Sequence, residues 1–147
     1  MAAERIGHVV WKGDLAHGEG RASARSSGLF TDVPVTWASR TERSEGKTSP
    51  EELLAAAHAS CFAMALSAGL AKARTPAERL EVRAAVTFDK VDQGFKVTSS
   101  ALEVEGRVPG IDQAAFARAA EEAKDGCPIS QALKGNVALS VKATLAR

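Results

Sequence analysis

The hydrophobic and polar positions in the first third of the chain follow patterns typical of strands. Residues 5–11 and 29–37 are rich in β-branched and aromatic residues, and residues 18–25 alternate small and polar side chains. Gly13-Asp14 and residues 26–28 lie between these runs and carry turn signals. We therefore predict an N-terminal meander of three strands.

A charged stretch over residues 40–47, predicted to be a loop, precedes the strongest local signal in the chain. Ser49 fits the N-cap of a helix, Pro50 fits its first position, and Glu52 fits the third position, where it would close a capping box. We predict a helix over residues 50–73, which a following Thr-Pro pair ends.

This long helix has almost no polar face, because Ala, Leu, Phe and Met fill it from Leu53 to Ala71. Such a helix is either buried all round or spans a membrane, and its length would allow a span. It is rich in Ala rather than Leu, Ile or Val, and it carries His58, Ser60 and Ser67, so we predict a buried central helix. A rod of roughly 36 Å is too long for one chain of this size to enclose, so we also predict a dimer.

The rest of the chain mixes both periodicities. Strand patterns cover residues 80–90, 94–105 and 137–145, and helix patterns cover residues 112–125 and 127–133. The first two strands form a β-hairpin. Asp112 caps the first of these helices, Gly126 stops it, and Cys127-Pro128 opens the next one. We predict a single α+β domain over residues 1–147.

Composition and charge narrow the classes of function. Of the 147 residues, 45% are hydrophobic and 25% are charged, which is ordinary for a globular protein, and the net charge of +1 offers no basic field for nucleic acid. The N-terminus shows no basic stretch followed by an apolar run, so we expect a cytoplasmic protein. Two cysteines in that compartment point to redox or catalytic chemistry, or to inert thiols, rather than to a permanent disulfide.

The two cysteines have different local settings. Cys61 lies among alanines in the long helix, where an apolar environment raises a thiol pKa, so a reactive Cys61 needs a positive group from elsewhere. Cys127 falls at a helix N-cap, where free N–H groups and the helix dipole favour a thiolate. The local sequence therefore favours Cys127 as the nucleophile.

A metal site is a weaker interpretation of the same helix. His58 and Cys61 are three residues apart on one helical face, but a tetrahedral zinc site needs a third or fourth ligand. We predict no metal, and we interpret His58 as a buried or interface histidine with its hydrogen bonds satisfied.

Three charged residues near the start of the long helix are further candidates. Glu52 serves the cap, which leaves Glu51 without a structural task. Arg40 and Arg43 are either solvated loop charges or guanidinium groups that stabilise a thiolate. Ten residues, roughly 15 Å of helix, separate Glu51 from Cys61, so Glu51 would have to reach the thiol through a long side chain or come from a partner subunit.

Several segments together resemble one known family. They are TSPEEL (48–53), AAHASCFAMAL (56–66) and GCPISQ (126–131), supported by WKGD (11–14), DKVDQGF (89–95) and VPGID (108–112). In this order they resemble the OsmC (osmotically inducible protein C) branch of the OsmC/Ohr group of hydroperoxide reductases.

The resemblance implies an intertwined homodimer with an α+β fold and two sites at the interface. It implies that Cys61 attacks the peroxide and that Cys127 resolves the resulting sulfenic acid as a disulfide. It also implies that Arg40 and its carboxylate partner Glu51 act across the interface. An insertion-like difference in the preceding loop leaves Arg40 and Arg43 as alternatives. The implied substrates are organic hydroperoxides and, more weakly, hydrogen peroxide, and the implied reductant is an external dithiol, often lipoyl, with no bound cofactor.

Two other classes of function fit the same residues. The cysteine pair could belong to a non-catalytic redox or lipid-hydroperoxide sensor, which oxidises once instead of turning over. The chain could also be a structural dimer with two inert thiols, which thiol titration would reveal.

Overall fold

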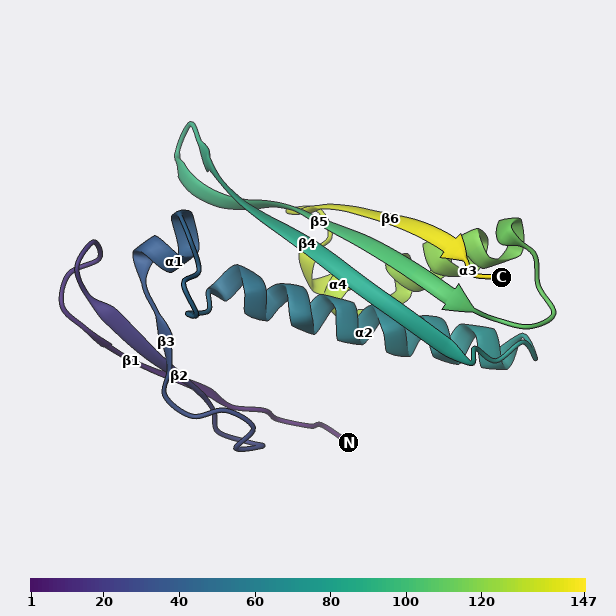
Figure 1. Ribbon diagram of the computed structural model, residues 1–147, viewed down its shortest axis with the longest axis horizontal. Coiled ribbons are helices and arrows are strands. Elements are labelled where there is room, and N and C mark those ends of the chain that lie inside the picture. The colour runs from purple at the N-terminus through teal and green to yellow at the C-terminus, as the bar shows by residue number, and fades with distance from the viewer. The chain divides into compact units, whose positions relative to one another are not determined.

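The computed structural model describes residues 1–147 and contains four helices and two three-stranded sheets (Figure 1). The chain divides into two units, Met1–Leu53 and Leu54–Arg147. Sheets and helices occur together as in the predicted α+β class, while the assignment of residues 1–147 to one domain stays a prediction.

The first unit contains the predicted N-terminal meander. Strands β1 (Gly7–Lys12), β2 (Glu19–Ala24) and β3 (Val33–Val35) are antiparallel neighbours in that order. The third strand is shorter than predicted because Thr36 begins a helix, α1 (Trp37–Thr41).

Helix α1 corrects the prediction that residues 40–47 form a loop, since Arg40 lies in its last turn. Thr36 and Ser39 form a capping box: the Thr36 hydroxyl accepts from the Ser39 N–H at 3.0 Å, and the Ser39 hydroxyl accepts from the Thr36 N–H at 3.0 Å. The box uses Ser at its third position, where Glu or Gln is usual, and the helix is only five residues long, so the sequence signal is faint.

The long helix α2 (Pro50–Lys72) has nearly the predicted bounds. Ser49 is its cap, because its hydroxyl accepts from the Glu52 N–H at 3.1 Å. The predicted capping box is only half formed, since the Glu52 carboxylate instead accepts from the Thr48 hydroxyl at 2.7 Å.

The prediction that α2 is buried all round is wrong for the single chain. One stripe with four-residue spacing is buried: His58, Phe62, Leu66 and Leu70. The opposite face is exposed and almost entirely apolar or small: Leu53, Ala56, Ala57, Ser60, Met64, Ser67, Ala68 and Ala71. By length and composition alone, α2 is also the one helix that could cross a membrane.

The second unit contains a mixed sheet in the order β4 (Arg79–Val91), β5 (Gly94–Arg107) and β6 (Ala138–Leu145). The first two strands form the predicted antiparallel hairpin, and the last strand pairs with β5 in parallel. Along β5, Ser100, Leu102 and Val104 are buried while Glu103 and Glu105 are exposed, so one face of the sheet is covered.

Helices α3 (Gln113–Gly126) and α4 (Pro128–Leu133) follow the hairpin. Asp112 caps α3 as predicted, accepting from the Ala115 N–H at 2.8 Å. Gly126 is still helical and does not stop α3; the stop is Cys127, whose backbone is extended (φ −60°, ψ 128°). The cause is Pro128, because the residue before a proline is pushed out of the helical region.

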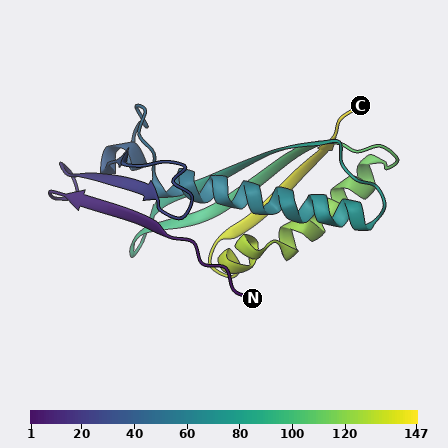
Figure 2. The ribbon, with the colours of Figure 1, turned by 90° about the horizontal axis from the view of Figure 1, so that it is seen from below.

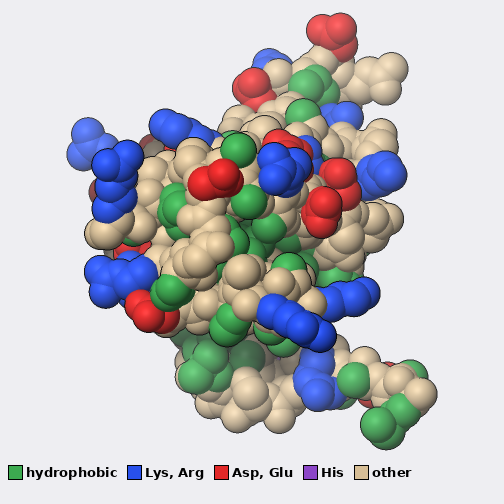
Figure 3. All heavy atoms as spheres, turned by 90° about the vertical axis from the view of Figure 1, so that its right-hand side faces the viewer, with side chains coloured by type: hydrophobic (Ala, Val, Ile, Leu, Met, Phe, Trp, Pro, Cys, Tyr) green, Lys and Arg blue, Asp and Glu red, His purple; other side chains and the backbone are tan.

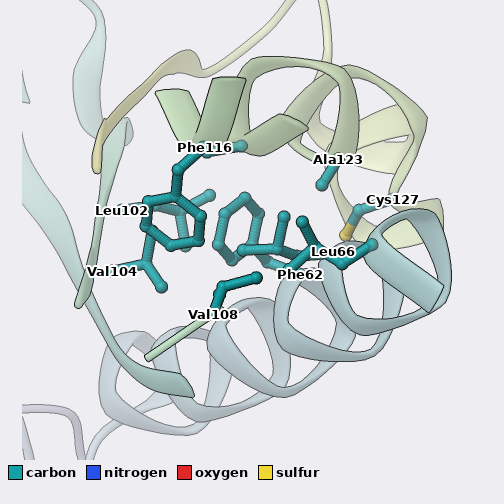
Figure 4. Packing of buried hydrophobic residues seen from close by; sticks show 10 residues of the cluster. Phe62, Leu66, Leu102, Val104, Val108, Phe116, Ala123 and Cys127 are labelled. Atoms are coloured by element: carbon teal, nitrogen blue, oxygen red, sulfur yellow. The ribbon is translucent and has the colours of Figure 1, made fainter. Parts of the chain in front are cut away.

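The hydrophobic core of the second unit joins α2, β5 and α3 (Figure 4). Figures 1 and 2 show α2 and α3 on the same side of the β4–β5–β6 sheet. Their fully or nearly buried side chains form one cluster: Phe62, Leu66, Leu70, Leu102, Val104, Val108, Phe116, Ala120, Ala123 and Cys127. One of the two cysteines is thus part of the core, with its sulfur at the edge of the cluster.

Charged side chains of both signs are interspersed on the face seen in Figure 3. No patch of a single sign is visible there, in keeping with a net charge of +1.

Candidate active site

The fold brings the two cysteines together in the second unit, although 66 positions separate Cys61 from Cys127 in the sequence. Cys61 lies on α2 and packs against the core while staying partly accessible. Cys127 is completely buried where α3 ends and α4 begins. Both are free thiols, and each influences the ionisation of the other.

The pKa of Cys61 is raised. Burial raises it first, and the hydrogen bond of its thiol with Cys127 raises it further, while the Ile129 N–H acts weakly in the opposite direction. Nothing in the second unit offers Cys61 a positive charge strong enough to reverse this, so Cys61 on its own is a poor thiolate.

The pKa of Cys127 is lowered in spite of burial, which opposes ionisation. The Ser130 N–H, the Cys61 thiol, the Ser130 hydroxyl and the Ile129 N–H all lower it. The thiol makes no close capping hydrogen bond at the start of α4, so these groups act as nearby dipoles around its sulfur. This agrees with the expectation from the sequence that Cys127 is locally the better thiolate.

His58 lies one helical turn before Cys61 and is completely buried. Its Nδ1 is 2.6 Å from the Ser100 hydroxyl of β5, and its Nε2 is 2.8 Å from the Ser130 hydroxyl of α4. Burial lowers the pKa of His58, so the ring is neutral. The expectation of a buried histidine with its hydrogen bonds satisfied is confirmed, and both ring nitrogens are occupied by serines.

The two serines were missed by sequence reasoning. Ser130 had a usable signal, since it lies three residues after an N-cap cysteine, where its N–H and hydroxyl can face the thiol. Ser100 had none, because it is one of several small polar residues in a strand and 42 positions separate it from His58.

In the first unit, Arg40 and Glu51 form a close ion pair. Arg40 Nη2 and Nε donate to Glu51 Oε1 at 2.8 Å and 3.0 Å, and Nε also lies 3.1 Å from Oε2. Glu51 is buried, and the Arg40 side chain is 30% exposed, with its guanidinium 6.0 Å from the Trp37 ring. Glu51 therefore has a structural partner, which the local sequence did not predict but the resemblance implied, while Arg43 is exposed beyond the end of α1.

Comparisons with known proteins agree with this architecture. Residues 43–142 match the family of OsmC-like proteins. The chain is 42% identical to "Peroxiredoxin OsmC" of Escherichia coli (strain K12) over 95% of this chain and 96% of that one. It is 32% identical to "Organic hydroperoxide resistance protein OhrA" of Bacillus subtilis (strain 168), over 84% and 86% of the two chains.

The fold is also similar to solved structures. It aligns with the organic hydroperoxide resistance protein OhrB of Bacillus subtilis with a TM-score of 0.73 at 24% identity, over 95% of this chain and 98% of that chain. An OsmC-like protein of unknown function from Vibrio cholerae aligns with the same TM-score at 16% identity, over 97% and 100% of the two chains. At these identities the likeness shows a shared mixed α+β fold.

Proposed function

Because the chain belongs to the OsmC-like protein family, we propose that it is a thiol-dependent peroxidase that reduces organic hydroperoxides, and hydrogen peroxide more weakly. The observation that carries the proposal is the meeting of its only two cysteines, one partly accessible and the other held in the core with a lowered pKa. The relatives named above as peroxiredoxin and organic hydroperoxide resistance proteins support the same reaction class.

The reaction begins at Cys61. Its thiolate attacks the outer peroxide oxygen, an S–O bond forms, the O–O bond breaks, and the alkoxide takes up a proton and leaves as an alcohol. Cys61 is now a sulfenic acid. Cys127 attacks that sulfur, which joins the two residues in a disulfide and releases water.

The accessibility of each thiol to a peroxide determines which cysteine reacts first. Cys127 has the lower pKa but is completely buried, so a peroxide does not reach it in the folded chain. Cys61 is partly accessible, and its raised pKa requires a cation near its sulfur during the reaction.

We assign that cation to the Arg40 of the partner subunit, held by the partner's Glu51. A pair of charge-assisted hydrogen bonds fixes the guanidinium within its own unit, which suits it to present a constant charge. Ten helical residues separate Glu51 from Cys61 in one chain, roughly 15 Å, and this favours a contribution from the other chain.

The dimer is supported by the exposed face of α2. Met64 is 73% exposed in the middle of that face, and no charged side chain interrupts it between Leu53 and Ala71. A continuous apolar helix face of this kind is typical of an interface. Two copies of α2 that pack through it would be buried on both sides, as the sequence pattern predicts.

The cycle closes with an external dithiol, such as a lipoyl group, which reduces the disulfide by exchange and leaves no cofactor bound. We place the protein in the cytoplasm, where such dithiols are kept reduced.

The test is turnover of cumene hydroperoxide with dihydrolipoamide by the wild type, Cys61→Ser, Cys127→Ser and, as a matched control, Ser140→Ala. Ser140 is exposed on β6, outside the apolar face of α2. The wild type and the control should turn over repeatedly, and Cys61→Ser should fall to the uncatalysed rate. Cys127→Ser should release one alcohol per chain and stall as a sulfenic acid that dimedone traps.

The result for each variant, and for the wild type, can contradict the proposal. Sustained turnover by Cys61→Ser would remove the peroxidatic assignment, and dithiol-driven cycling by Cys127→Ser would remove the resolving one. A wild-type protein that also stops after one oxidation would be a redox sensor, and one whose thiols react slowly and release no alcohol would be a structural dimer.

A further inference from the structure

Three polar side chains from three elements form a line of hydrogen bonds through the core of the second unit. Ser100 of β5 meets His58 of α2 at 2.6 Å, and His58 meets Ser130 of α4 at 2.8 Å. Ser100 and His58 are completely buried, and Ser130 is 1% exposed. Cys127 is the N-cap of the short helix that holds Ser130, three residues before it.

Burying polar groups in a core is costly, and apolar side chains of similar volume would pack there without that cost. The peroxidase cycle described above uses none of the three residues. Their role can be inferred from which of their hydrogen atoms is donated to which acceptor.

Two proton arrangements are available to a neutral imidazole, since one ring nitrogen donates and the other accepts. If Nε2 donates to Ser130, the Ser100 hydroxyl donates to Nδ1 and the Ser130 hydroxyl is free to donate onward. If Nδ1 donates to Ser100, the Ser130 hydroxyl is consumed by Nε2 and has no proton left for the sulfur.

The first arrangement gives every proton an acceptor when Cys127 is the last one in the line. The order is then Ser100 to His58, His58 to Ser130, and Ser130 to the sulfur of Cys127. Cys127 is the N-cap of α4, and Ser130 is the third residue of that helix. The thiol makes no capping hydrogen bond, but the N–H and the hydroxyl of Ser130 both lower its pKa, so both act on the same sulfur.

We propose that His58, backed by Ser100, is a positioning residue that aims the Ser130 hydroxyl at the sulfur of Cys127 and so prepares Cys127 to resolve the sulfenic acid. The proposal rests on the proposed function for its kinetic consequence, but not for its effect on the thiol itself. The lowered pKa of Cys127 is in keeping with it.

The step balances without a further reagent. Cys127 loses its proton and attacks the sulfur of the Cys61 sulfenic acid, so that an S–S bond forms and the S–O bond breaks. The hydroxide that leaves takes up one proton and becomes water, which equals the proton that Cys127 gave up.

Several titratable or charged groups face this line from the surrounding elements. Cys61 and His58 come from α2, and neutral His58 brings no charge. Lys124 and Asp125 at the end of α3 and Lys134 at the end of α4 line a cavity with Ser130. Lys124 is paired with Glu121 at 2.7 Å, and this hydrogen bond raises the pKa of Lys124.

The first experiment measures the pKa of Cys127 in a Cys61→Ser background, where it is the only thiol. Thiolate absorbance is followed against pH, so no reagent has to reach the buried sulfur and no peroxide is present. Ser130→Ala and His58→Leu should each raise the pKa by about one unit, the size expected for one lost hydrogen bond to an anion. Ser130→Thr and His58→Gln keep a hydroxyl and a side-chain N–H and should restore most of the shift.

Ser140→Ala is the matched control, since it removes a hydroxyl from an exposed position of β6, outside both the line of hydrogen bonds and the apolar face of α2. The pKa of Cys127 in this control should equal its pKa in the Cys61→Ser protein without a second substitution. Ser100→Ala leaves His58 and Ser130 in place and should raise the pKa by a smaller amount; it carries the test if Ser130→Ala does not fold. An unchanged pKa in the folded Ser130, His58 and Ser100 variants would overturn the proposal.

The second experiment keeps both cysteines and separates the two steps after one addition of peroxide. Sulfenic acid should form at the wild-type rate in Ser130→Ala, whereas disulfide formation should slow about tenfold at neutral pH. Raising the pH above the new pKa should restore the rate, because the thiolate then forms without help. A deficit that stays constant with pH would indicate a purely structural defect and contradict the proposal. A wild-type protein that never forms the sulfenic acid would remove the proposed function, while the result of the pKa titration would stand.

Discussion

Arg40 and Glu51 form the one close, largely buried ion pair of the first unit. This pair connects α1 to the start of α2. Removing one partner of such a pair leaves the other poorly compensated, which costs more than the pair itself contributes. The guanidinium presents two nitrogens to one carboxylate, so its plane is fixed as well as its position. A side chain held in this way is suited to stabilise a thiolate of another subunit.

We predict that Arg40→Lys lowers the rate of Cys61 oxidation by about 10- to 100-fold, because an ammonium cannot reproduce the forked geometry and loses a charge-assisted hydrogen bond. Stopped-flow measurement of sulfenic acid formation checks this. Arg43→Gln is the control for the alternative arginine and should stay within about twofold of the wild type, since an exposed loop charge contributes little. The opposite result would transfer the role to Arg43.

Packing of α3 on the sheet depends on a glycine in β5. A Cβ built on Gly106 would lie 2.4 Å and 2.8 Å from atoms of the Phe116 ring, and Phe116 is completely buried. The glycine is therefore required by the close approach of the helix to the strand, not by a turn. Gly126 at the end of α3 has nothing within 4 Å of such a Cβ.

We predict that Gly106→Ala destabilises the protein by about 1–3 kcal/mol through overpacking. Gly126→Ala, the matched control, should be neutral or more stable by up to about 1 kcal/mol, since alanine is the better helix former. Urea unfolding at one fixed protein concentration measures both, which removes the concentration dependence of a dimer. Equal stabilities for the two variants would show that Phe116 moves aside without cost.

At the scale of the molecule, the single chain leaves an apolar face of α2 in solvent, although the other face of the same helix holds the core. The stripe from His58 to Leu70 packs inside the second unit, and Met64 lies on the opposite face. The chain also exposes other large hydrophobic side chains: Val9, Val10, Trp11, Leu29 and Phe95.

We predict a dimer at micromolar concentration and its dissociation by Met64→Glu, which would bury a carboxylate against an apolar helix. Lys142→Glu, on an exposed position of β6, is the control and should stay dimeric. Light scattering and sedimentation distinguish the two states. Peroxidase activity of Met64→Glu should fall together with the dimer, and a fully active monomer would contradict the assignment of the partner's Arg40.

The sequence by itself determined the features that local patterns encode. The cap at Ser49, the helix start at Pro128, the cap at Asp112 and the hairpin all depend on residues a few positions apart, so spacing predicts them. The lowered pKa of Cys127 is likewise in keeping with its place at a helix start.

Tertiary structure decided which distant groups meet. The contacts of His58 with Ser100 and Ser130 join residues 42 and 72 positions apart, and no periodicity along the chain predicts them. The Arg40–Glu51 pair was implied by the resemblance but not by any local pattern, because it depends on α1, whose five residues carry too weak a signal. The one-sided burial of α2 also depended on packing, because a helix that is apolar all round does not specify which face its own chain covers.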